Sequence, residues 1–369
     1  MRYDRKEEGT QEEGSKEEGK EKGDQEEGRQ EGGEEEGAQE ESGEEESAQE
    51  EGRQEENEEG LRAASCLGGP HQIERATDIP GQRRWGLMAD ESPAGPAVSR
   101  ALVVGAGTMG TGIAQVLASA GIGVALVDPD AAARERSAKV LGARLAPMKD
   151  AAGEISTFEG VDAASGGAPD VAIEAVPESL DAKRAVFAEL DSSLDAGALL
   201  ATNTSSLSVT EIAEGLAHPE RVVGMHFMNP APIMKLVEVV RTRGSSEDAV
   251  ARAAALAERI GKKPVVVADT PGFVVNRVLI PMINEAARAI EAGTADPESV
   301  DAAMKLGANF RMGPLHLADL IGIDVVVEEL RQFEKTLGPG YAPSRELLSR
   351  LERGELGRKT GRGFFSYGR

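Results

Sequence analysis

Residues 101–110 read ALVVGAGTMG, and this stretch decides the fold class. Four apolar residues, typical of a short buried strand, lead directly into Gly105, Gly107 and Gly110. Residues 108–121 then show helical periodicity and end on a glycine. A strand, a G-x-G-x-x-G turn and a helix in this order predict the phosphate-binding turn of a Rossmann-type sheet.

Each residue type in this turn has a physical task. Gly105 permits the tight turn, Gly107 lets a pyrophosphate approach the backbone, and Gly110 lets the helix pack closely on the strand. Thr108 and Met109 begin the helix, whose free N–H groups and positive dipole end favour phosphate. The turn therefore predicts a dinucleotide site.

Asp128 follows the second apolar run, VALV, at about the spacing of a ribose-binding carboxylate. Its oxygens accept hydrogen bonds from ribose hydroxyls, and its charge repels a 2′-phosphate, so we expect NAD rather than NADP. The alternative for Asp128 is a helix N-cap before Pro129, which is compatible with the same role.

Strands and helices alternate up to about residue 270, and only helices are expected beyond it. Further strands are expected at 171–176, 198–203, 222–227, 235–240 and 264–268. Helices are expected at 129–146, 179–191, 208–216, 247–261, 273–292, 297–306, 315–334 and 343–353. The predicted fold is α/β, a Rossmann-type doubly wound parallel sheet at 99–270 followed by an all-α C-terminal domain at 271–369.

The N-terminal residues 1–98 differ sharply from the rest. Residues 1–60 hold 26 acidic and 8 basic side chains, against 65 and 41 in the whole chain, and almost no aliphatic ones. Such a segment cannot bury enough apolar surface to offset the entropy of ordering, so we expect a disordered acidic leader. An acidic interaction arm is the alternative. A second hypothesis is that translation begins at Met88.

Several classes of protein are disfavoured. The one cysteine, Cys66, permits no intramolecular disulfide and no cysteine metal cluster, and we expect no metal. No secretory signal is evident, and the apolar stretch from residue 271 to 290 is too charged to span a bilayer. No basic stripe with aromatic residues suggests nucleic acid. A cytoplasmic location fits these features.

Among the four histidines, position favours one as a site residue. His71 lies in the leader, His218 in a polar connection and His316 in an expected helix. His226 instead closes the apolar strand RVVGMHF and precedes the turn MNPAP. Ligands of open α/β sheets bind outside the carboxyl ends of strands, so His226 is either a site residue or a satisfied core histidine.

Seven stretches, taken together and in order, resemble one family over residues 100 to the C-terminus. They are GAGTMGTGIAQ, EAVPE, NTSSLSVTEIA, MHFMNPAPIMKLVEVV, TPGFVVNRVLIPMINEA, MKLGANFRMGPLHLADLIGID and LGRKTGRGFFSY. The sequence resembles the 3-hydroxyacyl-CoA dehydrogenases, and among them the bacterial enzymes of 3-hydroxybutyryl-CoA. The resemblance implies NAD-dependent oxidation of a short (S)-3-hydroxyacyl-CoA, and a homodimer formed through the helical domain.

The resemblance also implies catalytic roles. His226 would be the general base, and Glu238, at the end of the next strand, its orienting carboxylate. An imidazole with a pKa near ~6.5 takes a proton at physiological pH, and a carboxylate on its other nitrogen fixes the tautomer. Ser205 would contact the substrate hydroxyl near the nicotinamide, and Asn276 would help hold the reacting oxygen in a cleft between the domains. A helix cap is the alternative for Ser205, although Ser206 or Ser208 suits that task better.

Four further positions match cofactor contacts of the family. They are Glu178, Lys183, Asn229 and Lys359, beside Ser205 and the glycine turn. The alternative for Lys183 is a solvated helix lysine, and Lys359 would require the C-terminal segment to fold back over the site.

The sequence departs from the family in one segment. The helical hairpin after the second strand, which carries coenzyme A-binding lysines in the family, is short here. Lys139, Arg144 and Lys149 remain as candidate phosphate contacts, and a solvated charged helix face is the alternative for them. Phe227 and Met228 suit a small acyl pocket. Two alternatives stay open: a dehydrogenase of a free hydroxy acid of the gulonate or carnitine kind, and a catalytically silent NAD-binding protein resembling lens lambda-crystallin.

Overall fold

The computed structural model describes residues 98–148 and 151–368. The expectations for the leader, including Cys66, His71 and the start at Met88, lie outside the described residues, as does Lys149. The described residues fall within one compact unit of the chain, which extends from Arg83 to Arg369.

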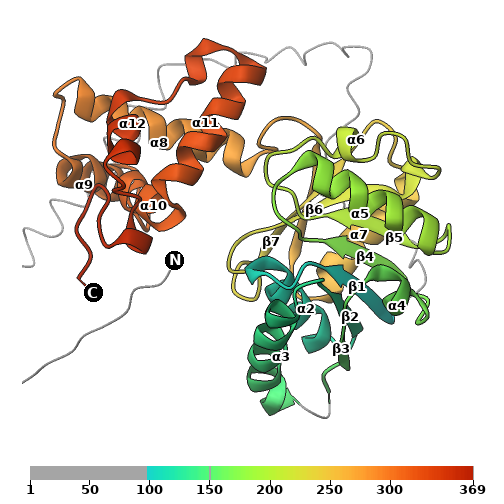
Figure 1. Cartoon of the computed structure of the whole chain (residues 1–369). Coiled ribbons are helices and arrows are strands. Elements are labelled where there is room, and N and C mark those ends of the chain that lie inside the picture. The colour runs from blue at the N-terminus through green and yellow to red at the C-terminus, as the bar shows by residue number, and fades with distance from the viewer. Residues whose placement is uncertain (1–97, 149–150, 369) are drawn as a thin grey trace, which may run out of the picture. The chain divides into compact units, whose positions relative to one another are not determined.

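Eight strands form one sheet in the order β3-β2-β1-β4-β5-β6-β7-β8 (Figure 1). The strands are β1 (Arg100–Val104), β2 (Gly123–Val127), β3 (Ile155–Phe158), β4 (Val171–Glu174), β5 (Leu199–Thr202), β6 (Val222–Phe227), β7 (Leu236–Arg241) and β8 (Lys263–Ala268). Every neighbouring pair is parallel except β6 and β7, which are antiparallel. The predicted Rossmann-type sheet is therefore confirmed, with one strand pair reversed.

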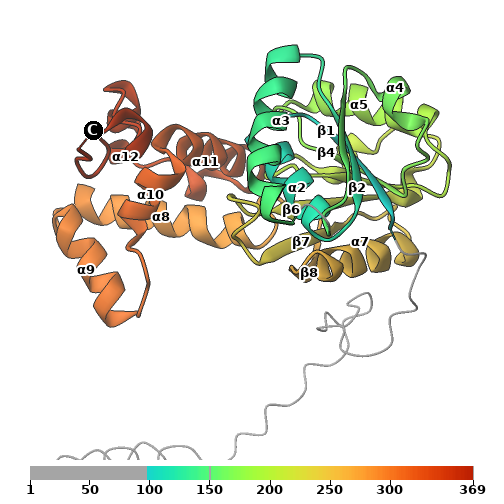
Figure 2. The ribbon, with the colours of Figure 1, turned by 90° about the horizontal axis from the view of Figure 1, so that it is seen from below.

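Helices cover both faces of the sheet, which explains the nearly continuous apolar strands. In β1, Ala101 and Val103 pack into the core beneath the first group of helices, whereas Leu102 and Val104 pack beneath the second. The first group is α2 (Thr108–Ser119), α3 (Ala131–Leu145) and α7 (Glu247–Arg259). The second is α4 (Val161–Ser165), α5 (Leu180–Ser193) and α6 (Val209–Ile212), and Figure 2 shows the sheet between the layers.

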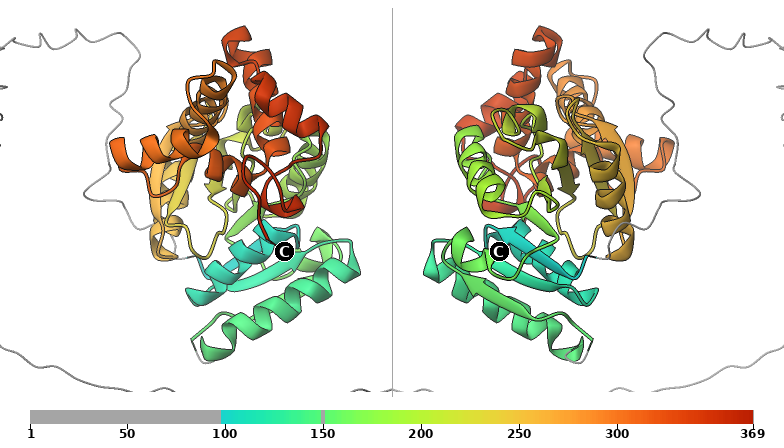
Figure 3. Two further views of the ribbon diagram at one scale, coloured as in Figure 1. Left: turned by 90° about the vertical axis from the view of Figure 1, so that its left-hand side faces the viewer. Right: turned by 90° about the vertical axis from the view of Figure 1, so that its right-hand side faces the viewer.

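The described segment after the sheet contains helices and, near its end, isolated β-bridges that pair Gly357 with Arg362 and Arg362 with Ser366 (Figure 3). Its helices are α8 (Val275–Glu291), α9 (Pro297–Gly307), α10 (Pro314–Ile321), α11 (Ile323–Leu337) and α12 (Arg345–Glu352), around a separate apolar core. The single helix expected at 315–334 is two helices, because Gly322 adopts φ +111° and ends α10. This conformation interrupts the ladder of helical hydrogen bonds.

Three expectations for the first domain were incomplete. β3 and α4 were missed, because residues 147–170 were not assigned to any strand or helix. The helix expected at 208–216 is only α6, four residues long, capped by Ser208 as proposed. Short elements of this kind carry too few residues to show a period.

One buried carboxylate fastens the end of the described chain. Asp319 in α10 is 1% exposed and accepts hydrogen bonds from the backbone N–H groups of Phe364 and Phe365 and from the Tyr367 hydroxyl. The C-terminal segment is thereby bound to the helical core. None of the helices in the described ranges combines the length and apolar character that a bilayer crossing needs.

Candidate active site

The glycine turn joins β1 to α2, and one of its three glycines has free space where a side chain would lie. A Cβ on Gly105, at φ +105°, would lie 2.6 Å from the Ala175 carbonyl oxygen, and one on Gly110 only 1.8 Å from the Gly105 oxygen. A Cβ on Gly107 meets nothing within 4 Å. Gly107 is also the N-cap of α2 and makes no side-chain cap. The outer glycines are required by packing, and the middle one leaves helix N–H groups free for an anion.

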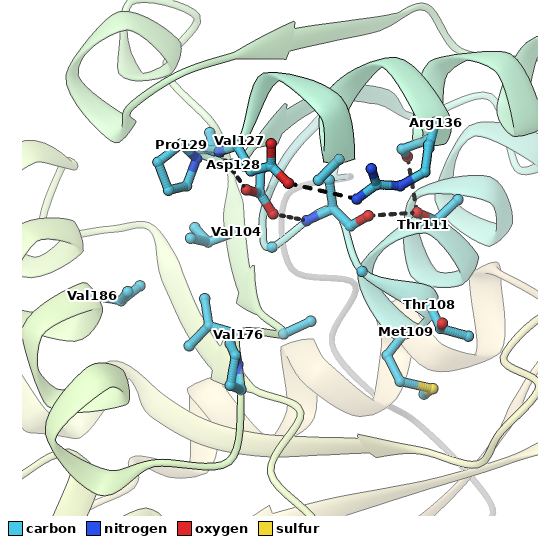
Figure 4. A pocket seen from close by; sticks show the side chains of 18 of the residues that line it. Val104, Thr108, Met109, Thr111, Val127, Asp128, Pro129, Arg136, Val176 and Val186 are labelled. Atoms are coloured by element: carbon cyan, nitrogen blue, oxygen red, sulfur yellow. Dashed lines mark hydrogen bonds and ion pairs between the residues drawn. The ribbon is translucent and has the colours of Figure 1, made fainter. Parts of the chain in front are cut away.

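A cavity of about 1150 Å³ opens over this turn. Figure 4 shows Thr108, Met109 and Asp128 around it, together with Val104, Val176 and Val186. Glycines and apolar side chains make up most of the lining, as in typical cofactor sites, and charged side chains join them from Asp128, Asp130, Arg136, Arg144, Glu159 and Glu189. An extended dinucleotide fits a cavity of this size beside an open glycine and a free helix N-terminus.

Asp128 is tied to the glycine turn. Its Oδ2 accepts from the Ala106 N–H at 2.7 Å, and its Oδ1 from the Asp130 N–H at 2.9 Å. Asp130, not Asp128, is the N-cap of α3 and accepts from the Ala132 N–H. The capping alternative for Asp128 is therefore wrong, and its carboxylate faces the cavity from the end of β2.

Lys183 is not a solvated helix lysine. It is 1% exposed, and its Nζ lies 2.8 Å from Glu174 Oε1, 3.3 Å from Glu178 Oε2 and 3.3 Å from the Val176 carbonyl oxygen. These three acceptors match the three donors of an ammonium group. The ammonium therefore fixes the loop after β4 from within. Glu174 was not among the predicted site residues, although a charged residue in an otherwise apolar strand was a signal for it.

Glu178 connects this loop to the segment after β5. Its Oε1 accepts from the Thr204 hydroxyl, the Ser206 hydroxyl and the N–H groups of Ser205 and Ser206. Burial opposes ionisation, but the Lys183 charge and these hydrogen bonds outweigh it and hold the pKa of Glu178 below its usual value. Glu178 is thus an anion that positions the backbone of Ser205.

His226 and Glu238 meet across the antiparallel pair. They are directly opposite in register, and His226 Nδ1 lies 2.7 Å from Glu238 Oε2. Glu238 is in the middle of β7, not at its end, and the reversed direction of β7 places its side chain on the same face as the imidazole. A carboxylate only accepts, so Nδ1 donates and Nε2 is left as the free nitrogen.

The second oxygen of Glu238 also has partners. Its Oε1 accepts from the N–H groups of Val274 and Val275 at the start of α8, each at 3.0 Å. The His226 ring packs against Phe273, 5.6 Å between centroids. Asn276 follows in the first turn of α8. The dyad is therefore fastened to the helix that carries Asn276.

The remaining predicted residues lie apart from this cluster or make other contacts. Asn229 is exposed after β6 and precedes Pro230 in a cis peptide bond. The Lys359 Nζ pairs with Asp324, 2.6 Å from its Oδ2, and Lys359 does not line the cavity over the glycine turn. The structure does not bring Lys359 to the glycine turn, and its role toward NAD stays a prediction.

One residue of this region was missed entirely. Glu329 of α11 is 6% exposed, and its Oε2 has no hydrogen-bond partner among the described residues. Burial and the nearby charge of Glu178 raise its pKa to about 7, and Glu328 adds to this, against a hydrogen bond from the Ser205 hydroxyl that lowers it. The available signal was its place between the core positions Val326 and Phe333 on one helix face.

The sheet order, the open glycine and the cavity define an NAD-binding dehydrogenase fold. Residues 100–270 match the family described as "3-hydroxyacyl-CoA dehydrogenase, NAD binding domain", and residues 272–367 match "3-hydroxyacyl-CoA dehydrogenase, C-terminal domain". The chain belongs to the 3-hydroxyacyl-CoA dehydrogenase family, as the resemblance predicted.

Individual relatives agree with this assignment. The chain is 44% identical over 282 residues to a probable 3-hydroxybutyryl-CoA dehydrogenase of Bacillus subtilis, covering 73% of this chain and 98% of the relative. It is 43% identical over 278 residues to 3-hydroxybutyryl-CoA dehydrogenase of Clostridioides difficile, covering 72% and 98%. The crystal structure of (S)-3-hydroxybutyryl-CoA dehydrogenase PaaH1 from Ralstonia eutropha superposes with a TM-score of 0.69 at 37% identity, covering 74% of this chain and all of that one.

Proposed function

We propose that this chain interconverts a short (S)-3-hydroxyacyl-CoA, such as 3-hydroxybutyryl-CoA, and the 3-oxoacyl-CoA, with NAD as the hydride carrier. The observation that supports this most directly is the buried pair of His226 and Glu238, whose free imidazole nitrogen is the right group for a hydroxyl proton. The names of the similar bacterial enzymes support the acyl-CoA substrate.

The chemistry assigned to this site balances as follows. Bound NAD would supply the hydride acceptor for C3 of the substrate, and His226 Nε2 would take the hydroxyl proton as the carbonyl forms. Glu238 holds the imidazole in the tautomer with a free Nε2 and stabilises the imidazolium. Ser205 and Asn276 hold the reacting oxygen. In the reverse direction the imidazolium returns its proton to the oxygen.

The cofactor residues divide into direct and supporting ones. We assign direct contacts with NAD to Gly105, Gly107, Thr108, Met109 and Asp128 around the cavity, and close packing of the turn to Gly110. Glu178 and Lys183 hold the loop that positions Ser205. Asn229 and Lys359 remain assigned by resemblance alone.

A free hydroxy acid is the second candidate substrate. Between β2 and β3 the described residues form only α3 and a short 3₁₀ turn at Ala146–Met148, in place of a long hairpin for coenzyme A. Arg144 in α3 is engaged with the Gln115 side chain, which leaves fewer basic groups for phosphates there. This observation favours a substrate without coenzyme A.

One assay distinguishes these substrates. The full chain is mixed with NADH and either acetoacetyl-CoA, free acetoacetate or a keto sugar acid, and NADH absorbance is followed. We expect rapid loss only with the thioester. Turnover of a free acid alone would replace the first proposal by the second, and no turnover with any substrate would favour the crystallin-like alternative.

We further infer a homodimer formed through the helical domain, and a cytoplasmic location. Exposed apolar side chains on these helices are candidates for the interface, because a contiguous exposed apolar surface often marks a protein–protein contact. They include Val278, Leu306, Leu320 and Val325. Light scattering of the full chain tests this: a monomer mass at micromolar concentration would contradict it.

A further inference from the structure

Lys262, between α7 and β8, is a buried lysine that the proposed mechanism does not use. It is 8% exposed, and its burial lowers its pKa below the usual value. An ammonium group is costly to bury unless hydrogen bonds replace its water, so its partners indicate what it does.

Both partners of this ammonium are carbonyl oxygens in the connection between β6 and β7. The Nζ donates to the Ala231 oxygen at 2.6 Å and to the Met234 oxygen at 2.8 Å. The connection forms a tight turn here, because the N–H groups of Ile233 and Met234 both donate to the Pro230 oxygen at 3.0 Å. The ammonium therefore binds this segment, which we call the 230–234 turn, at two points.

The backbone of Lys262 is itself fixed on both sides. Gly261 adopts φ +74° at the end of α7, and the Lys262 N–H donates to the Ala257 oxygen at 2.8 Å. This is the hydrogen bond by which a Schellman motif ends a helix. The next residue begins β8, where the Lys263 N–H donates to the Lys235 oxygen at 2.7 Å. The ammonium thus extends from a backbone that is held by both a helix and the sheet.

A second element, α2, contacts the 230–234 turn. A Cβ on Gly112 of this helix would lie 3.2 Å from Ala231 Cβ and 3.3 Å from Pro232 Cδ. Ala231 is 3% exposed and belongs to the same apolar core as α2. The absence of a side chain at Gly112 therefore lets the turn pack closely on the helix that begins at the glycine turn.

The 230–234 turn also joins the two strands of the proposed catalytic pair. His226 is one residue before the end of β6, Glu238 is the third residue of β7, and the two are opposite in register. The turn therefore connects this pair to α2, whose N-terminus we assign to the cofactor phosphates. A reacting group displaced by about 1 Å can lose up to 10²-fold in rate, so the position of the turn matters for hydride transfer.

We propose that Lys262 is a positioning residue: by holding the 230–234 turn against α2, it sets the distance between the nicotinamide and the substrate carbon beside His226. This inference rests on the proposed function, since it takes His226 as the base and the glycine turn as the cofactor site. The ammonium acts through the two carbonyl oxygens of the turn and needs no contact with substrate or cofactor.

The kinetic test compares Lys262→Met with the unmodified chain. Methionine keeps an apolar stem of similar length but donates no hydrogen bond. Each full chain is loaded with NADH and mixed with excess acetoacetyl-CoA, and the first turnover is followed by NADH absorbance. We expect the first-turnover rate to fall roughly ten- to hundred-fold. Deuterium at C4 of NADH should slow this phase in both proteins, which identifies it as hydride transfer.

Two measurements accompany this rate. The Kd for NADH should change little in Lys262→Met, because no residue of the 230–234 turn lines the cavity over the glycine turn. The matched control is Lys263→Met, which removes the neighbouring exposed lysine and should keep the unmodified rate. A lysine with a merely structural role would lower the free energy of unfolding but leave the first-turnover rate of the folded protein unchanged.

A readout without turnover uses the free protein. The N–H groups of Ile233 and Met234 are hydrogen-bonded within the turn, so their hydrogen exchange reports how often the turn opens. We expect both amides to exchange faster in Lys262→Met than in the unmodified chain and in Lys263→Met.

A second variant displaces the turn from the side of α2 and keeps the test decisive if Lys262→Met fails to fold. Gly112→Ala places a methyl group against the turn, while alanine favours the helix, so the variant should fold. We expect its first-turnover rate to fall roughly three- to ten-fold. Gly142→Ala in α3 is the matched control: its methyl group meets no atom within 4 Å, and its rate should be unchanged.

The outcomes separate the two proposals. In a chain that turns over the thioester, unchanged first-turnover rates in Lys262→Met and Gly112→Ala overturn the role of Lys262 alone. A slower Lys262→Met whose turn amides exchange no faster does the same. If Lys262→Met does not fold, an unchanged rate in Gly112→Ala overturns it. A chain inert toward the thioester overturns the proposed function and this inference together.

Discussion

Glu238 on β7 and Glu329 on α11 are both buried carboxyls, yet their surroundings differ. Both oxygens of Glu238 are occupied, one by the His226 imidazole and one by two backbone N–H groups. One oxygen of Glu329 has no partner among the described residues, and a like charge lies nearby. Donors, not burial alone, decide whether a buried carboxyl is a fixed anion or an acid that titrates.

The largest expected effect concerns Glu238, whose two oxygens are both hydrogen-bonded, and its partner His226. His226→Gln removes the proton acceptor but keeps a group that can bond to Glu238. We expect thioester turnover to fall by about 10²–10⁴-fold while NADH affinity, measured by fluorescence titration, is nearly unchanged. Activity close to that of the unmodified chain would show that the base is another group.

The next largest effect concerns the other well-satisfied carboxylates. Lys183→Met leaves the buried carboxylate of Glu174 and the partly exposed carboxylate of Glu178 without their shared cation. Removing one partner of a buried ion pair costs about 3–5 kcal/mol, so urea unfolding should show a loss of this order. The matched control is Lys139→Met in α3, whose lysine is exposed, and it should change stability little. Equal losses in both variants would contradict the role given to Lys183.

The pKa shifts of Glu178 and Glu329 make their contributions to folding stability depend on pH in opposite directions. The pKa of Glu178 is lowered in the folded chain, so its contribution is present above the unfolded value of 4.5 and is lost as pH falls through the folded value. Glu329 has the opposite sign. Its pKa is raised from 4.5 to about 7, so the folded chain binds its proton more tightly, and the stability this supplies falls as pH rises from 4.5 to about 7.

Glu329→Gln should therefore remove the pH dependence of stability that Glu329 contributes. The variant has no charge to bury, so it should gain stability over the unmodified chain at about pH 8 relative to about pH 5, by up to roughly 3 kcal/mol. Thermal melts at the two pH values measure this. A difference that does not change with pH would mean that Glu329 is ionised throughout or solvated.

The smallest expected effect concerns the glycine turn, in which Gly110 is closely packed and Gly107 has free space around it. Gly110→Ala places a methyl group against the Gly105 backbone, so we expect a loss of about 1–3 kcal/mol. Gly107→Ala meets no atom within 4 Å, so stability should be retained while NADH affinity falls. Unchanged NADH affinity in Gly107→Ala would argue against a phosphate beside that glycine.

The sequence predicts most of the fold because its strongest signals are local. The strands on both sides of the glycine turn are apolar runs, and seven of the eight strands were located in this way. β3 was missed because ISTF is short and half-exposed, so it shows neither an apolar run nor a clean alternation. The direction of β7 follows from the short connection after β6, since a parallel return needs a crossover of a dozen or more residues.

The site was predictable where a residue's role depends on a motif, and less so where it depends on long-range pairing. His226 closes a strand, and the resemblance supplied Glu238 as its partner. Glu174 and Lys183 make a buried pair whose members are nine positions apart in sequence, on a strand and the following helix. Glu329 looks like one more charge on an amphipathic helix until the fold brings Ser205 and Glu178 beside it.

The hydrogen bonds that Asp319 accepts from the C-terminal segment have a consequence for the end of the chain. Removing the chain from Phe364 onward would remove all three of these hydrogen-bond donors to Asp319. Its carboxylate would then be buried in the helical core without them. Residues 364–367 therefore help to hold the helical core together. Tags added after residue 369 should be tolerated, whereas even a short clipping of the C-terminus should loosen the helices.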